Sequence, residues 1–243
     1  MKISLLCPSR ERLNKFITFT SSVFATVDNI NNIEIVLGID DDDSKIDSYK
    51  RIAKNLNFVT LIVFESKLFK REGLSGLWNK MAKKCSGDII AMVGDDMIFQ
   101  TVDWDTKIIE TFKQQKDNIC LVHCNDGMRG PGNKYAAVEP LAVNSFIHRD
   151  YIDAVGRYVQ TEESNIFQDT YLDTLFKALG RKIYYHNIMI KHLHFSEGGT
   201  KDATSERLEE TRVGIWDNND LFREKLTPVL QKEIKILEGK IKR

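Results

Sequence analysis

The stretch that decides the fold is IIAMVGDDMIF, residues 89–99. Its apolar residues run from Ile89 to Val93 and stop at Gly94, which predicts a short buried strand followed by a turn. Asp95 and Asp96 come directly after that glycine. Two adjacent carboxylates at the end of a buried strand repel each other and lose hydration, so they need a positive charge nearby. Either a divalent cation lies here, or the two acids form a solvated turn that caps the next helix.

The composition excludes several classes of protein. A chain of 243 residues, 42% of them hydrophobic, can form one large domain or one domain with an appendage. Equal numbers of basic and acidic residues, 35 of each, give no support for nucleic-acid binding. No apolar stretch reaches the roughly 18 residues of a transmembrane helix, and the first apolar run is too short for a signal peptide. We therefore expect a cytoplasmic protein.

The cysteine pattern agrees with that location. The chain has four cysteines, which are scattered through apparent strands and a helix end: Cys7, Cys85, Cys120 and Cys124. In an enzyme-sized chain without an export signal we expect free thiols. Cys120 and Cys124 flank His123, but their spacing is that of a strand and no second cysteine pair follows, so we expect core residues and no zinc site.

Apolar runs alternate with helical patterns in the first half of the chain. This order predicts a mostly parallel sheet with helices on both faces. Ligands bind beyond the carboxyl ends of such strands, where this chain has the turns PSRER, DDDDS and GDD. We expect the fold to bring these charged turns together. The predicted strands are 2–7, 33–39, 57–64, 88–93 and 118–124, and the predicted helices are about 11–26, 45–55, 75–85 and 104–115.

The second half of the chain has a different pattern. Residues 125–140 are rich in glycine and proline and predict a long loop, which is often functional in a compact domain. Strands are expected at 141–149, 181–186 and 188–195, with helices at 150–156 and 168–180 that end in glycine. The last forty residues predict helices.

Several motifs of other enzyme classes are missing. The first predicted strand leads into CPSRER, which lacks the glycines of a dinucleotide-binding turn. The chain also has no phosphate-loop motif and no Gly-x-Ser-x-Gly elbow. An NAD enzyme, a P-loop ATPase and a serine hydrolase are therefore not expected.

Taken in order, seven motifs resemble the family 2-like glycosyltransferases of the GT-A fold. They are CPSR, DDDDS, LWNKMAKKCSGDII, GDD, HRDYIDAVGRY, FQDTYLDTLFKALGRKIYY and HLHF, which together span roughly residues 1–196. The resemblance implies an α/β GT-A domain over residues 1–200, with a nucleotide-binding half at about 1–124 and an acceptor half at about 125–200. Residues 201–243 would form a C-terminal helical extension.

The resemblance implies a metal-dependent enzyme that moves a sugar from a nucleoside diphosphate, with a UDP-sugar favoured, to a hydroxyl of a glycan or other acceptor, with inversion. Asp96 would bind Mn²⁺ or Mg²⁺ directly, and Asp95 would bind the metal or the ribose of the substrate. His194 would be a further metal ligand, for which His192 is the alternative. Asp169 would be the general base. The remaining substrate-binding residues implied are Pro8, Ser9 and Arg10 against the base, Asp40 or Asp41 at the base edge, and Asn79 and Gln168.

Two positions depart from the family pattern. Gln168 stands where the family has a glutamate, and Trp78 beside Asn79 stands where it has an arginine. Glutamine still donates and accepts hydrogen bonds but carries no charge. Two alternatives therefore stay open: a nucleotidyltransferase of similar fold, although CPSRER lacks the glycine-rich turn of that class, and a non-catalytic module that binds nucleotide sugars. For Asp169 the alternative is a helix cap.

The C-terminal stretch KLTPVLQKEIKILEGKIKR, residues 225–243, is basic, with apolar residues near helical spacing. Such a helix either lies on an anionic membrane surface or packs on the domain or on a second subunit.

Overall fold

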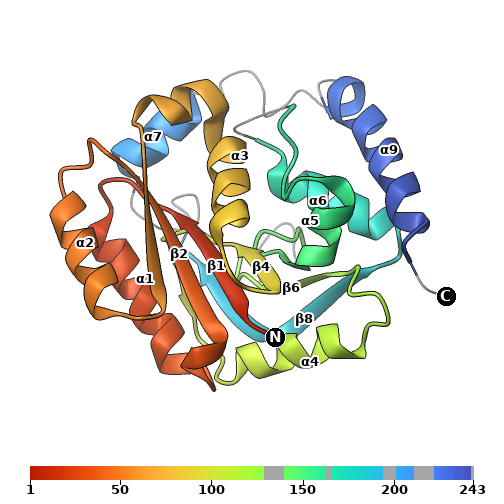
Figure 1. Cartoon of the computed structure of the whole chain (residues 1–243), viewed down its shortest axis with the longest axis horizontal. Helices are drawn as coiled ribbons and strands as arrows, with labels where there is room; N and C mark the ends of the chain where they lie inside the picture. Colours follow the sequence, from red (N-terminus) through yellow and green to blue (C-terminus); the bar gives the residue numbers. More distant parts are fainter. Residues whose placement is uncertain (129–139, 163–165, 194–200, 211–221, 242–243) are drawn as a thin grey trace.

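The structure is a computed structural model that describes residues 1–128, 140–162, 166–193, 201–210 and 222–241. Figure 1 shows a central sheet with helices on both sides. The described strands are β1 Ile3–Pro8, β2 Ile33–Asp40, β3 Val59–Phe64, β4 Ile89–Met92, β5 Met97–Phe99, β6 Leu121–Asn125, β7 Phe146–His148 and β8 Lys182–His192. The described α-helices are α1 Leu13–Thr26, α2 Ile46–Asn55, α3 Lys67–Lys84, α4 Trp104–Gln114, α5 Arg149–Val155, α6 Gln168–Ala178, α7 Ala203–Glu210 and α9 Thr227–Glu238, with short helical turns at Ile30–Asn32 and Phe222–Leu226.

The described strands form one sheet in the order β3-β2-β1-β4-β7-β6-β8-β5. β3, β2, β1 and β4 are parallel, and so are β6 and β8. β7 runs antiparallel to both of its neighbours, and β5 runs antiparallel to β8. The predicted parallel sheet is thus confirmed for the first half of the chain, while the second half adds antiparallel strands.

Alternating side chains of the buried strands supply two hydrophobic cores, one on each face of the sheet. Ile3, Leu5 and Cys7 of β1 face the core that contains α1, α2 and α4. Leu6 faces the opposite core, which contains α3, α5, α6 and α9. The predicted helices on both faces are confirmed. The four cysteines are buried and free, as expected.

The C-terminal helix packs on the domain. α9 lies beside α5 and α6 (Figure 1). Leu230 and Leu237 are 5% and 0% exposed and belong to the second core, and Glu233 pairs with Arg157 at 2.8 Å. Of the two alternatives for this helix, packing on the domain is therefore the one the structure shows. None of the described helices has the length and hydropathy that a bilayer crossing needs.

Some element boundaries differ from the prediction. α3 begins at Lys67, because a first helical segment joins the predicted one across Gly73, whose φ of 59° interrupts the helix. The predicted strands at 181–186 and 188–195 are one continuous strand, β8. Only Phe146–His148 of the predicted strand 141–149 pairs with the sheet. Most of the predicted loop 125–140 lies outside the described residues.

Candidate active site

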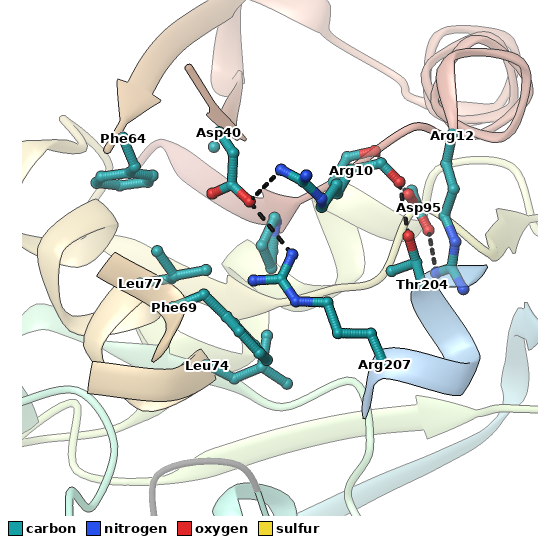
Figure 2. Close-up of a pocket in the computed structure, with 13 residues that line it drawn as sticks. Arg10, Arg12, Asp40, Phe64, Phe69, Leu74, Leu77, Asp95, Thr204 and Arg207 are labelled. Carbon is teal, nitrogen blue, oxygen red and sulfur yellow. Dashed lines mark hydrogen bonds and ion pairs between the residues drawn. The ribbon is translucent and has the colours of Figure 1, made fainter. Parts of the chain in front are cut away.

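A pocket opens at the carboxyl ends of the parallel strands, where the sequence predicts a site. Figure 2 shows its two sides. The apolar side comes from the end of β3 and from α3: Phe64, Phe69, Leu74 and Leu77. The polar side comes from the turns after β1, β2 and β4 and includes Arg10, Asp40 and Asp95. The three charged turns thus meet at one place, and the cavity between them holds about 80 Å³.

Asp40 forms the polar floor of this pocket at the end of β2. It is 5% exposed. Arg10 Nη1 donates to its Oδ2 atom at 2.7 Å, and Arg207 Nη1 donates to the same atom at 3.4 Å. Burial raises the pKa of Asp40, although the two arginines act in the opposite direction. The carboxylate is therefore a buried acceptor that two guanidinium groups satisfy.

The positive charge beside the acidic pair is Arg12. Its Nη1 donates to Asp95 Oδ1 at 3.1 Å, and Ser9 Oγ donates to Asp95 Oδ2 at 2.6 Å. Asp95 is 2% exposed. Burial raises the pKa of Asp95 to about 6, even with the opposing charge of Arg12. A buried carboxylate with a raised pKa in a pocket is typical of functional sites, because burying a carboxylate without full compensation costs stability.

Asp96 has a different partner from Asp95, namely His192. Asp96 Oδ1 lies 3.4 Å from His192 Nε2, and the backbone amide of Leu193 donates to the Asp96 carbonyl at 2.8 Å. A Cβ at position 94 would lie 2.4 Å from Asp96 Oδ1, so any residue other than glycine there would displace this carboxylate. Burial raises the pKa of Asp96, but the His192 hydrogen bond and charge outweigh it and lower the pKa.

Three carboxylates influence His192. Burial lowers the pKa of this imidazole, but the hydrogen bond and charge of Asp96, together with the charges of Asp126 and Asp169, outweigh it and raise the pKa. The antiparallel pairing of β5 with β8 places His192 opposite Met97, next to the acidic pair. Two parts of the chain that are distant in sequence thus form one electrostatic cluster.

The donor set suits a hard divalent cation that a substrate helps to hold. Mg²⁺ and Mn²⁺ prefer oxygen ligands, and Mg²⁺ commonly takes one or two protein carboxylates together with phosphate oxygens. Asp95 and Asp96 supply two such carboxylates at the strand end, the first buried and the second half-buried. Within the described ranges, no three His, Cys, Asp or Glu side chains are grouped to hold a metal by themselves. A cation here would therefore need ligands beyond these described side chains, such as the oxygens of a bound phosphate.

A pocket beside two carboxylates at the carboxyl ends of the strands lies where open α/β sheets bind their ligands. The sequence model of glycosyl transferase family 2 matches residues 8–196, which include all of these turns. The chain belongs to glycosyl transferase family 2. The protein is therefore a glycosyltransferase, a class that uses nucleotide sugars.

Solved structures show the GT-A fold of this family 2 glycosyltransferase. The mannosyltransferase PcManGT from Pyrobaculum calidifontis, in complex with GDP-Man and Mn²⁺, matches with a TM-score of 0.66 at 14% identity, over 97% of this chain and 69% of that chain. S. aureus TarS 1-349 matches with a TM-score of 0.60 at 12% identity, over 96% of this chain and 77% of that chain. TarS 1-349 in complex with UDP-GlcNAc gives a TM-score of 0.59 at 12% identity, over 90% of this chain and 68% of that chain. No curated protein matches.

The residues predicted for the donor fall into two groups in this glycosyltransferase. Five of them line one pocket: Pro8, Ser9, Arg10, Asp40 and Asp95. Asp41 lies outside it, and its Oδ1 accepts from the backbone amide of Ser66 at 2.9 Å. Of the two aspartates predicted for the base edge, the structure therefore places Asp40 in the pocket.

Asn79 and Gln168 hold neighbouring segments together. Asn79 Nδ2 donates to the Val159 carbonyl at 2.9 Å, and its Oδ1 accepts from the amides of Tyr158 and Val159 at 2.8 and 3.2 Å. Gln168 Nε2 donates to Ser75 Oγ at 2.8 Å, and Gln168 is 4% exposed. Both side chains thus connect α3 to the segment that contains α5 and α6, and their roles in substrate binding stay predictions.

Asp169 lies at the start of α6, half-buried, and its Oδ1 accepts from the backbone amide of Thr170 at 2.8 Å. The N-cap residue of α6 is Phe167, which makes no side-chain cap hydrogen bond, so Asp169 lies inside the first turn. The charge of Asp169 also raises the pKa of His192, near the acidic pair. His194 lies outside the described residues, so its role as a metal ligand stays a prediction. His192, the alternative, is the histidine that faces Asp96.

Sequence reasoning missed Arg12, Phe69, Thr204 and Arg207, all of which line the pocket. Arg12 belongs to the basic turn PSRER, whose charge indicated that the turn contributes to a site. Nothing in the local sequence shows which of its two arginines reaches Asp95. Phe69 is one of many apolar residues in its region. Thr204 and Arg207 come from α7, in a part of the chain without a recognisable motif.

Proposed function

We propose that this glycosyltransferase binds a nucleoside-diphosphate sugar with the base in the pocket and the diphosphate toward Asp95 and Asp96. The observation that carries this proposal is the position of Asp40, a buried carboxylate facing an apolar wall at the carboxyl ends of the strands. An aromatic and aliphatic wall accepts the face of a base, and a carboxylate accepts a hydrogen bond from its edge. The acidic pair follows β4, which is separated from β2 by β1 in the sheet.

A carboxylate acceptor favours a base with a ring N–H at its edge. Uracil and guanine both present such a group, whereas the ring nitrogen at the corresponding edge of adenine or cytosine has no hydrogen. The complexes of the similar proteins are consistent with this class, since PcManGT was solved with GDP-Man and TarS 1-349 with UDP-GlcNAc. We propose a UDP-sugar as the donor, with a GDP-sugar as the other member of the class to be tested.

The metal proposed for the site is Mn²⁺ or Mg²⁺, held by Asp96, by Asp95 and by His194. When bound, such a cation supplies Lewis-acid stabilisation of the charge that develops on the leaving diphosphate. Mn²⁺ in the PcManGT complex supports the choice of metal. Arg12 and Lys15 place two further positive charges near the acidic pair, and both lower the pKa of Asp96.

Asp169 is proposed as the general base. It takes the proton of the acceptor hydroxyl as the hydroxyl oxygen attacks the anomeric carbon, and the bond to the diphosphate breaks on the opposite side, which inverts that centre. The acceptor is a glycan or another molecule with a free hydroxyl. Gln168, next in the chain, would orient the acceptor once its side chain leaves Ser75.

A donor panel tests the proposal. The protein is incubated with Mn²⁺ and UDP- or GDP-sugars, and free nucleoside diphosphate is assayed with and without a panel of hydroxyl acceptors. Acceptor-stimulated release of UDP, with less release of GDP, is the expected result. Binding without release from any donor would identify a non-catalytic module. Formation of a nucleoside triphosphate and a sugar 1-phosphate when pyrophosphate is added to the NDP-sugar would identify a nucleotidyltransferase.

A further inference from the structure

Helix α7 reaches the pocket from the far end of the chain. Figure 2 shows Thr204 and Arg207 of this helix among the residues that line it. Thr204 Oγ1 donates to the carbonyl of Arg10 at 2.9 Å. Arg207 extends further, between the apolar wall and Asp40 (Figure 2). Helix α7, which follows all of the described strands in sequence, thus forms part of the wall of the proposed donor site.

The guanidinium of Arg207 makes the two contacts that a nucleobase would make there. Its Cζ atom lies 4.0 Å from the centre of the Phe69 ring, so the flat group stacks on the aromatic wall. Its Nη1 donates to Asp40 Oδ2 at 3.4 Å. A planar group that stacks on Phe69 and presents an N–H to Asp40 occupies the place of the base.

The space that remains is too small for a nucleotide. The cavity holds about 80 Å³ with α7 in place. Pockets for ligands of nucleotide size hold about 300 Å³ or more. Thr204 and Arg207 line this small cavity, so the base of a nucleotide and the Arg207 guanidinium cannot both lie between Phe69 and Asp40.

Asp202 anchors α7 near the acidic pair. Its carboxylate accepts from Arg12 Nη2 at 2.6 Å and from Lys15 Nζ at 2.8 Å. It also accepts from the backbone amide of Ser205 at 3.0 Å, which caps the helix. Arg12 is shared, because its other terminal nitrogen donates to Asp95. A diphosphate bound beside Asp95 would compete with Asp202 for Arg12, so donor binding and release of α7 are linked.

We propose that α7 closes the donor site of the unliganded protein, with Arg207 in the place of the base, and that the nucleotide binds only after α7 withdraws. The proposal rests on the proposed function, because it takes the pocket to be the donor site. An apparent dissociation constant rises by the inverse of the fraction of molecules that are open, so weakening α7 strengthens nucleotide binding.

Isothermal titration with UDP and with GDP, each with Mn²⁺, tests this linkage in the full chain. Arg207→Ala removes the stand-in for the base, and Asp202→Asn weakens the anchor outside the pocket. Both variants are expected to bind the nucleotide about threefold more tightly than the wild type, or better. Arg51→Ala, an exposed arginine on α2, and Glu210→Gln, an exposed acid on α7, are the charge-matched controls and should bind as the wild type does.

Hydrogen exchange gives a second measurement that needs no variant. The amides of 203–210 should exchange faster in the wild type when UDP and Mn²⁺ are added, because α7 leaves the pocket. Slower exchange there, or a variant with the same nucleotide affinity as the wild type, overturns the inference. Weaker binding by Arg207→Ala overturns it as well and makes Arg207 a ligand of the donor. If neither nucleotide binds the wild type or any variant, the proposed function itself fails, and the inference fails with it.

Discussion

Asp95 and Asp96 are adjacent in sequence but have different surroundings. Asp95 turns to Ser9 and Arg12, in the turn after β1, while Asp96 turns to His192 at the end of β8. The repulsion between the two carboxylates is relieved by a separate positive or hydrogen-bonding partner for each. Each carboxylate of the pair therefore has its own partner in the structure, with Asp95 buried and Asp96 half-buried.

Asp96→Ala is expected to remove most of the metal dependence of nucleotide binding, because Asp95 is already held by Arg12 and Ser9. The wild type should bind UDP about tenfold more tightly with Mn²⁺ than with EDTA. Mutation of residues that only orient metal ligands already costs about tenfold or more in metal affinity, so loss of the metal itself should have an effect of at least this size. Calorimetric titration under both conditions measures the difference. Asp47→Ala, an exposed acid on α2, is the control. Equal affinity for UDP with and without Mn²⁺ in the wild type would rule out the metal assignment.

Asp169→Asn separates the general base from the helix cap. As the base, Asp169 is needed only for proton transfer, so the variant should keep its melting temperature and its UDP affinity and lose about a hundredfold in transfer rate. As a cap alone, its loss would cost about 1 kcal/mol of stability and leave turnover nearly intact. Thermal melts, together with transfer assays that use the donor found by the donor panel, distinguish the two roles. Near-normal transfer would move the base to Asp173 or Glu163, although Asp173 is already paired with Lys182 at 2.7 Å.

At the scale of elements, α9 completes the core beneath α5 and α6. Leu237 and Leu226 are both 0% exposed and belong to the same core as the residues of those helices. Arg157 and the buried Glu233 add an ion pair between α9 and the segment after α5. Because this packing buries the apolar side of the helix, α9 stabilises the catalytic domain itself.

Leu237→Ala is expected to lower the free energy of unfolding by about 2–5 kcal/mol, because it removes buried methyl groups and leaves a cavity. Urea denaturation followed by circular dichroism measures the change. Lys235→Ala, an exposed position on the same helix, should change the unfolding free energy by less than about 0.5 kcal/mol. Equal stability of the Leu237 variant and the wild type would show that α9 is not part of the cooperative unit.

At the scale of the whole molecule, a buried glutamate connects strands at the end of the sheet opposite the pocket. Glu34 on β2 is 6% exposed. It accepts hydrogen bonds from Ser4 Oγ of β1 at 2.6 Å, from the amide of Ser86 at 2.8 Å and from Thr60 Oγ1 of β3 at 3.1 Å. Burial raises the pKa of Glu34, but these hydrogen bonds outweigh it and lower the pKa.

This network predicts a pH dependence of stability. Because the folded state lowers the pKa of Glu34, its contribution is present above the unfolded value of about 4.3 and is lost as the pH falls below it. As the pH is lowered from about 5, the unfolding free energy of the wild type should therefore fall more steeply than that of Glu34→Gln. Urea denaturation at a series of pH values below about 5 measures both. Parallel pH profiles for the two proteins would contradict the assignment, and Glu65→Gln, an exposed acid, controls for net charge.

The local pattern of the sequence determined the first four parallel strands, the helices between them and the meeting of three charged turns. Each strand is a buried apolar run, and neighbouring elements connect by short right-handed crossovers, so the path follows from nearby residues. The same logic placed Ser9, Arg10, Asp40 and Asp95 in one pocket. The motif order, which a local pattern can carry, pointed to the family that the comparison then showed.

Tertiary structure alone decided which partner each charge has. Nothing near Arg12 in sequence indicates that it bridges Asp95 and Asp202, because the two carboxylates reach it from positions 83 and 190 residues away. The antiparallel pairing of β5 with β8, which brings His192 to Asp96, likewise depends on the path of the later chain. Arg207 has no motif around it, and only the folded chain places its guanidinium on Phe69 and Asp40. Strand formation depends on local periodicity, whereas side-chain pairing depends on distances that only the complete fold sets.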